Sequence, residues 1–220
     1  REAGRSPFMV ALILLVFFVI SLLTNIMGPL IPDIIRSFSL SLTLAALLPF
    51  SFFIAYGVMS IPSGILLERV REKPVMVAAF GLAFCGAFLF SLFLIGAGMA
   101  ALQVAVNPLL RVAGGEEHFA FNSVLAQLFF GGASFLSPYV YSHFVTKLGA
   151  LGPDSPAHIK LMSRLVPSGL PWISIYWVFA GLVLATIAVL GLVRFPAVVR
   201  KEEERAGAWS THRSLFKHRT

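Results

Sequence analysis

Long apolar segments separated by short polar ones dominate the pattern of this chain. Few charged residues lie inside these segments, which cover residues 8–30, 41–67, 75–110, 119–145 and 170–193. A helix that crosses about 30 Å of hydrocarbon needs roughly 20 apolar residues, so each segment is long enough for at least one crossing. The pattern therefore predicts an all-α integral membrane protein.

The third segment is long for a single crossing and short for two. It has 36 residues without a charged side chain, and Ser91 is the only plausible turning point within it. Two crossings would leave about 17 residues for each helix, which is near the lower limit for a membrane span. We expect residues 1–194 to form a six-helix transmembrane domain, with helices over about 8–30, 41–67, 75–91, 92–110, 119–145 and 170–193.

The placement of the basic residues orients the chain and favours six helices over five. With a cytoplasmic N-terminus, thirteen of the 17 Lys and Arg residues fall in inside segments, and the other four are Arg36, Lys147, Lys160 and Arg164. This is the positive-inside distribution of membrane proteins. We therefore expect both termini to be cytoplasmic and residues 195–220 to form a basic cytoplasmic linker. The net charge of +7 is thus explained by topology, and it gives no reason to expect a nucleic-acid partner.

Composition and motifs argue against an enzyme. Hydrophobic residues make up 58% of the chain and charged residues 12%, below the quarter or so that is typical of soluble domains. The single cysteine, Cys85, cannot form a disulfide or zinc framework within the chain. Phosphate-binding loops, zinc-protease motifs and nucleophile elbows are all missing from the sequence. We expect no catalytic residues, no metal and no cofactor.

The first segment has a distorted outer end. Gly28, Pro29 and Pro32 follow one another closely there, and such residues kink or break membrane helices where neighbouring groups satisfy the freed carbonyls. We expect a short outside loop to follow, carrying Asp33 and Arg36.

Four side-chain amides lie at membrane depth and are the candidate binding residues: Asn25, Gln103, Asn107 and Gln127. A buried amide costs free energy unless it is hydrogen-bonded, so each marks a helix–helix contact or a polar cavity. Taken singly, each amide is explained equally well by a cavity or by an interhelical hydrogen bond, which would stabilise the fold by about 1 kcal/mol or less. Four amides on three helices favour a cavity, and amides both donate and accept, which suits the hydroxyls of a sugar.

The loop after the second helix resembles the signature loop of the major facilitator superfamily, G-x-x-x-D/E-R-x-G-R/K-K/R-P. The matching residues are Gly64, Glu68, Arg69, Lys73 and Pro74. Arg71 replaces a glycine of that pattern and Glu72 replaces a basic residue. The resemblance implies that the loop forms salt bridges or helix-end contacts that bias one conformation, and a loop that merely sets topology is an equal alternative.

Two further stretches resemble the fucose permease branch of the superfamily. Residues 96–108 are similar to G-x-G-x-x-x-L-E-T-A-A-N-P, and residues 118–127 are similar to H-F-R-L-N-L-A-Q. The resemblance implies a six-helix N-terminal bundle of a sugar transporter in the bacterial inner membrane. It also implies a fucose- or hexose-like substrate and a partner in the form of a C-terminal six-helix half.

The resemblance fails at two residues that matter for coupling. Residues 24–29 also resemble a permease stretch, N-D-I-L-L-P. The permease has carboxylates where this chain has Asn25 and Gln103, and those carboxylates are associated with proton coupling and sugar binding. A carboxylate can take up and release a proton, and an amide cannot. Coupling to sodium, coupling to protons and uncoupled facilitation therefore all remain alternatives.

Two other hypotheses remain. In the first, the chain is a non-transporting six-helix partner or assembly subunit, and its amides are interhelical contacts. In the second, it is a half-size transporter that works as a homodimer.

Overall fold

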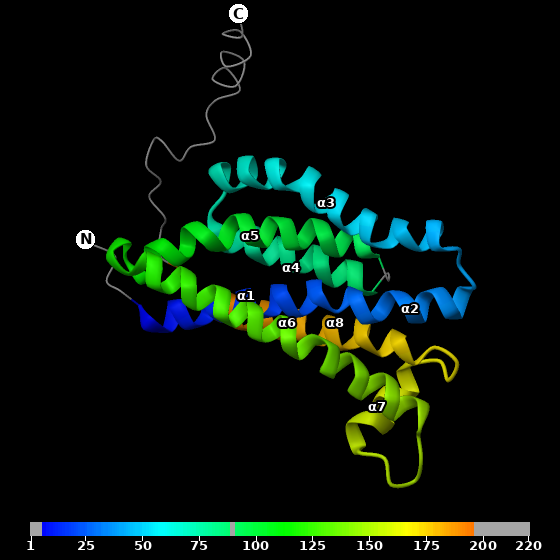
Figure 1. Ribbon diagram of the computed structural model, residues 1–220. Coiled ribbons are helices and arrows are strands. Elements are labelled where there is room, and N and C mark those ends of the chain that lie inside the picture. The colour runs from blue at the N-terminus through cyan, green and yellow to red at the C-terminus, as the bar shows by residue number, and fades with distance from the viewer. Residues whose placement is uncertain (1–5, 89–90, 196–220) are drawn as a thin grey trace, which may run out of the picture.

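The computed structural model describes residues 6–88 and 91–195, and every regular element in this part of the chain is helical (Figure 1). This confirms the all-α prediction. The predicted linker, residues 195–220, lies outside the described residues except for its first position. Eight α-helices are described: α1 (Pro7–Asn25), α2 (Met27–Phe38), α3 (Leu42–Arg69), α4 (Glu72–Phe88), α5 (Leu92–Gly114), α6 (Phe119–Gly149), α7 (Ala157–Leu165) and α8 (Ser174–Leu192).

Membrane crossings can be assigned to these helices by length and composition. Five stretches of the described chain are long and apolar enough to span a bilayer: Pro7–Phe38, Leu42–Arg69, Leu92–Gly114, Glu116–Gly149 and Pro171–Leu192. Helix α4 is the shortest of the long helices, with 17 residues. At 1.5 Å per residue it is about 26 Å long, near the lower limit for a crossing.

The apolar stretch 75–110 is divided between α4 and α5. Ser91 is the N-cap of α5, and its side chain accepts a hydrogen bond from the backbone N–H of Leu94. A serine is well suited to this position because its oxygen satisfies one of the N–H groups that a helix start leaves unpaired. The polar residue that interrupts the apolar run thus starts a new helix.

The first crossing is broken, but the expected outside loop is wrong. The helix is interrupted at Ile26 and starts again as α2, which continues through Asp33 and Arg36 to Phe38. Pro29 is the third residue of α2, where a backbone N–H has no intrahelical partner in any case, so proline is tolerated there. Asp33 is therefore a helical residue within the first membrane-spanning stretch.

Two other loops also differ from expectation. Only Val70 and Arg71 separate α3 from α4, so the signature-loop residues are themselves helical. The long polar segment before the last crossing contains the short helix α7, followed by a 3₁₀ turn at Pro171–Ile173 that leads into α8.

Helices α1 and α5 form the centre of the bundle. Helix α5 packs against α3, α4 and α1, while α1 packs against α6 and α5, and α8 closes the far side against α4. Val16, Val19 and Ile20 of α1 are completely buried, as are Leu102 and Val106 of α5. In Figure 1, α3 lies along one side of the bundle and α6 crosses the other.

Two glycines allow α5 to approach its neighbours closely. A Cβ atom added to Gly96 would lie 2.4 Å from the carbonyl oxygen of Phe52 in α3. One added to Gly98 would lie 2.6 Å from the carbonyl oxygen of Ala79 in α4. Small residues at such crossings let membrane helices pack backbone to backbone.

Helices α3 and α6 leave apolar surface uncovered along their lengths. In each, only 17% of the most apolar 18-residue window is buried. The exposed side chains include Leu47, Phe50, Phe53 and Val58 of α3, and Val124, Leu128, Phe135 and Tyr139 of α6. Such faces are stable against lipid or against another helical unit.

Candidate functional site

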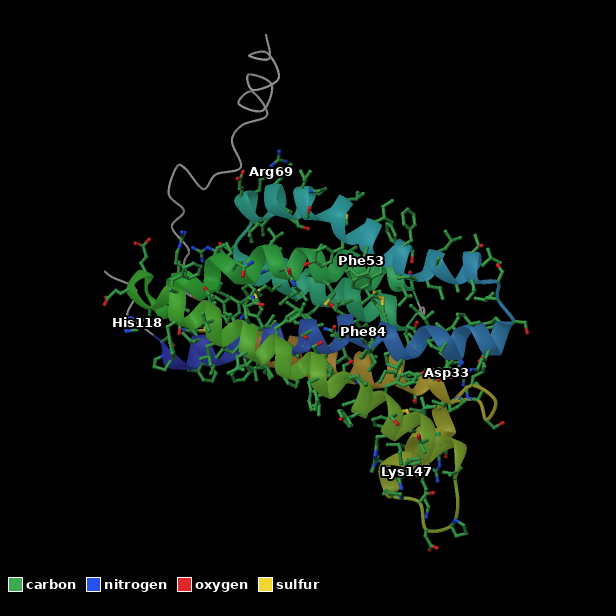
Figure 2. All side chains as sticks on the ribbon, viewed as in Figure 1. Asp33, Phe53, Arg69, Phe84, His118 and Lys147 are labelled. Atoms are coloured by element: carbon green, nitrogen blue, oxygen red, sulfur yellow. The ribbon has the colours of Figure 1, made fainter. Side chains whose placement is uncertain are left out.

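The bundle has two distinct ends, which the labelled residues of Figure 2 identify. Arg69 and His118 lie at one end, and Asp33 and Lys147 lie at the other. We call these the His118 end and the Asp33 end. At the His118 end the backbone N–H of Ser6 donates to the carbonyl of Ala113 at 3.2 Å, which ties the start of α1 to the last turn of α5.

Helix α5 carries an open stripe on an otherwise buried surface. From Ile95 to Leu102 every residue is buried, whereas Gln103 and Val104 are half-buried and Asn107 is exposed. Gln103, Asn107 and Arg111 follow one another at intervals of four residues, so they lie on one face of the helix. Two of the predicted amides therefore share this open face.

Helix α6 presents Gln127 on its own exposed surface. Within the described part of the chain, the side-chain amides of Gln103, Asn107 and Gln127 have no hydrogen-bond partner. An amide that is both accessible and unpaired can donate to one hydroxyl and accept from another. These three residues are therefore better suited to contact a polar ligand than to hold helices together.

The fourth predicted amide, Asn25, is engaged within its own helix. Its Nδ2 donates to the carbonyl of Ser21 at 2.9 Å and to the hydroxyl of Ser21 at 3.1 Å. Ser21 in turn donates to the carbonyl of Phe130 in α6 at 2.5 Å. Both bonds of Asn25 therefore stay within α1, and Ser21 is the residue that links α1 to α6.

The depths of the four amides can be compared because α1, α5 and α6 share the His118 end. At 1.5 Å per residue, Gln103, Asn107 and Gln127 lie roughly 10–17 Å from this end, while Asn25 lies roughly 27 Å from it. The structure groups three of the predicted residues at similar depth. Asn25 is about 10–17 Å further along the bundle than these three.

A cavity of about 400 Å³ opens at the His118 end, between α1, α5 and α6. Its wall is mostly apolar, and Asn122 and His118 are its polar members. Asn122 is only 7% exposed, and its amide lies against Gly114, where a Cβ would come within 2.1 Å of Nδ2. His118 and Asn122 belong to the stretch that resembles the permease pattern, but neither stood out in the sequence as a candidate binding residue.

The signature-loop residues lie at the same end, and one of them makes a contact with a distant helix. The Nζ of Lys73 donates to the carbonyls of Gly191 and Val193 at 2.8 and 2.6 Å. These carbonyls end α8, where a cation is favourable because helix C-termini carry partial negative charge. Lys73 therefore makes a helix-end contact, while Glu68, Arg69 and Pro74 are exposed and Gly64 is half-buried.

A row of polar contacts between α6 and the first crossing was not predicted. Ser137 donates to the carbonyl of Leu22 at 3.2 Å, and the Tyr141 hydroxyl donates to the carboxylate of Asp33. Together with the bond from Ser21 to Phe130, these contacts run along α6 toward the Asp33 end. A carboxylate a few residues from the end of an apolar segment was the one signal in the sequence that could have indicated this row.

The histidines give no metal centre. Among the described residues no three His, Cys, Asp or Glu side chains come together in a way that could hold a metal ion. His143 of α6 and His158 of α7 do meet, with their Nε2 atoms 3.1 Å apart. Their ring centroids are 5.4 Å apart and the rings are nearly parallel, so the two nitrogens face each other edge to edge and link the two helices.

Comparison with known proteins places these features in a family. The chain is 27% identical over 246 aligned residues to the L-fucose-proton symporter of Escherichia coli (strain K12), covering 98% of this chain and 54% of that protein. It is 34% identical over 129 residues to a glucose/galactose transporter of Brucella abortus biovar 1 (strain 9-941), covering 52% of this chain and 31% of the relative. These relatives are transporters, not enzymes.

The fold is also found in a solved transporter. The crystal structure of FucP in the outward conformation matches with a TM-score of 0.64 at 21% identity, covering 99% of this chain and 57% of that one. The chain therefore spans about half the length of the proteins it matches. The family model described as Major Facilitator Superfamily matches residues 13–220, so this chain is an integral membrane protein that belongs to the Major Facilitator Superfamily.

Proposed function

We propose that this chain forms the N-terminal six-helix half of a transporter that carries a monosaccharide across the membrane by alternating access. The observation that carries the proposal is the set of three unpaired amides, Gln103, Asn107 and Gln127, at similar depth on open faces of α5 and α6. Relatives named as fucose and glucose/galactose transporters support a sugar as the substrate.

A second six-helix half is the proposed partner. In secondary transporters of this kind the substrate site lies near the bilayer midplane between two halves that rock against each other. The open stripe of α5 would form one wall of the site. The uncovered apolar faces of α3 and α6 would flank that wall and pack against the other half.

The proposed orientation places the His118 end in the cytoplasm. Arg69, Arg71, Lys73 and Arg111 all lie at or near this end, which agrees with the positive-inside rule. Both termini would then be cytoplasmic, and the bacterial inner membrane is the proposed location. At this face Lys73 holds α4 to the end of α8, so the signature loop would help to keep the bundle rigid while it rocks.

Sugar counterflow tests the function directly. The full-length protein is reconstituted into liposomes preloaded with unlabelled L-fucose, D-glucose or D-galactose, and entry of the same labelled sugar is followed. We expect saturable counterflow with at least one of these sugars, and none with a non-sugar solute such as an amino acid. If none of the three sugars moves above the level of empty liposomes, the proposed function is wrong.

A further inference from the structure

The cavity at the His118 end contains a buried amide that makes no hydrogen bond. Asn122 lines this cavity and is 7% exposed. Within the described residues its side chain has no hydrogen-bond partner. Because no side-chain nitrogen or oxygen of that part of the chain is both fully sealed and unpaired, the amide must be open to the cavity. A nearly buried amide of this kind is stabilised by any polar group that enters the cavity and bonds to it.

Gly114 makes room for this amide. It is the last residue of α5, and Asn122 lies in the first turn of α6. A Cβ added to Gly114 would lie 2.1 Å from the Nδ2 of Asn122, so a larger residue at this position would displace the amide. The turn between α5 and α6 therefore holds one polar group at a defined point in a wall that is otherwise mostly apolar.

The size and lining of the cavity indicate a class of ligand. Its volume of about 400 Å³ is within the range of small-molecule sites. Leu14 and Leu125 contribute apolar surface, and Phe121 contributes an aromatic ring. The polar side chains of Asn122 and His118 can each donate and accept a hydrogen bond, so together they can bind one hydroxyl or one amide.

A sugar or a charged molecule fits this cavity poorly. Most hydroxyls of a monosaccharide would lie against the apolar wall without a partner, which costs free energy for each of them. A carboxylate or ammonium group would lose its hydration, and the described residues that line the cavity include no Asp, Glu, Lys or Arg. A neutral aromatic ring with one hydroxyl or amide fits better, because the ring can pack on Phe121 while the polar group bonds to Asn122.

The cavity lies on the face of α5 that carries the candidate amides. Gly114 follows Asn107 by seven residues, or about two helical turns, so both residues face the same way. The cavity is therefore about 10 Å from Asn107, toward the cytoplasm in the proposed orientation. Pro7 and Ala11 of α1, both exposed, line it as well. A molecule bound there would obstruct the face along which a sugar held by the amides leaves.

We propose that this cavity binds a small neutral aromatic alcohol or amide, and that the bound molecule inhibits transport from the cytoplasmic side. The binding site follows from the geometry of Asn122 and Gly114 and does not depend on what the protein transports. Only the inhibition rests on the proposed function.

Binding of 2-naphthol to the purified full-length protein tests the site. Calorimetric titration in one detergent keeps the partition of the probe into micelles equal for all variants. We expect saturable binding to the wild type and roughly 2–12-fold weaker binding to Asn122→Leu, the loss that corresponds to one hydrogen bond. Ala11→Phe should abolish binding because its ring fills the cavity. Leu15→Phe, one turn further along α1 and outside the lining, should bind as the wild type does.

The melting temperature separates a ligand-binding role of Asn122 from a structural one. An amide without a partner contributes no hydrogen bond to the fold, so Asn122→Leu should melt at the same temperature as the wild type or at a higher one in the absence of the probe. 2-Naphthol should raise the melting temperature of the wild type more than that of Asn122→Leu. A lowered melting temperature for the probe-free variant would make Asn122 a structural residue and overturn its role in binding.

Two further results would overturn the inference. The first is a wild-type protein that does not bind 2-naphthol saturably, or an affinity that is the same in the wild type and all three variants. The second is sugar counterflow that 2-naphthol does not slow, since we expect inhibition that needs a roughly 2–12-fold higher concentration in Asn122→Leu. If no sugar moves even without the probe, the proposed function fails, and the titration still decides whether the site exists.

Discussion

Replacing Gly96 by alanine tests the close packing that holds the open stripe of α5 in place. The new Cβ would lie 2.4 Å from the carbonyl oxygen of Phe52, whereas ordinary contact begins at 3.4 Å. The backbones of α3 and α5 would have to separate by about 1 Å, the difference between these distances. Overpacking of this kind costs about 1–3 kcal/mol, which for a protein of this size corresponds to a fall in melting temperature of roughly 2–12 °C.

The assay is the melting temperature of the purified protein in detergent, with Gly57→Ala as the matched control. Gly57 is also helical, but a Cβ there would meet nothing within 4 Å. Its replacement should therefore leave the melting temperature unchanged or raise it slightly, because alanine favours the helix by about 0.5–1 kcal/mol. Equal melting temperatures for Gly96→Ala and Gly57→Ala would refute the close approach of α3 and α5.

Two further predictions concern contacts between distant parts of the chain. The Trp172 indole N–H donates to the Ser37 hydroxyl at 2.8 Å. Trp172→Phe removes this bond and should therefore destabilise the Asp33 end by about 0.5–1.5 kcal/mol. A melting temperature equal to that of wild type would show that the bond contributes nothing. Lys73→Met removes the cation from the carbonyls that end α8 and should lower the free energy of unfolding by about 1–2 kcal/mol. Lys73→Arg keeps the cation and should retain most of the stability. An equal loss of stability in both variants would rule out the helix-end interaction.

Hydrophobic patterning predicted the helices because the bilayer leaves few alternatives. A backbone in hydrocarbon must satisfy its own hydrogen bonds, so long apolar runs become helices whatever their neighbours are. The division of residues 75–110 at Ser91 follows from local chemistry as well, since a serine in an apolar run is a natural helix cap. These features depend on residues close in sequence, and for that reason the sequence was sufficient.

The continuation of α2 through Asp33 could not be predicted from the sequence in this way. Pro29 and Pro32 suggested the end of a helix, but whether proline breaks or begins a helix depends on where the next helix starts. The sequence also carries little signal for the short helix α7, because only Ile159 within it is buried. The contact between His143 and His158, which links this helix to α6, depends on the tertiary fold.

The candidate site was only partly accessible from sequence because polar residues acquire their roles through tertiary contacts. Asn25 and Gln103 look alike as membrane amides, yet Asn25 bonds to Ser21 and Gln103 has no partner within residues 6–88 and 91–195. The contact between Tyr141 and Asp33 joins residues 108 positions apart. No spacing rule connects such a pair, and only the packing of α6 against the first crossing brings it together.

The most direct test of the account is the sugar affinity of a Gln103→Leu variant of the full-length protein, measured by counterflow at increasing sugar concentration. Loss of one hydrogen bond worth about 0.5–1.5 kcal/mol predicts an affinity roughly 2–12-fold weaker, with the melting temperature unchanged. Gln103→Glu keeps the size and an acceptor oxygen of the side chain and loses only the N–H donor, so it should retain more of the affinity than Gln103→Leu. A Gln103→Leu variant with wild-type affinity and a lowered melting temperature would contradict the account and make this amide an interhelical contact.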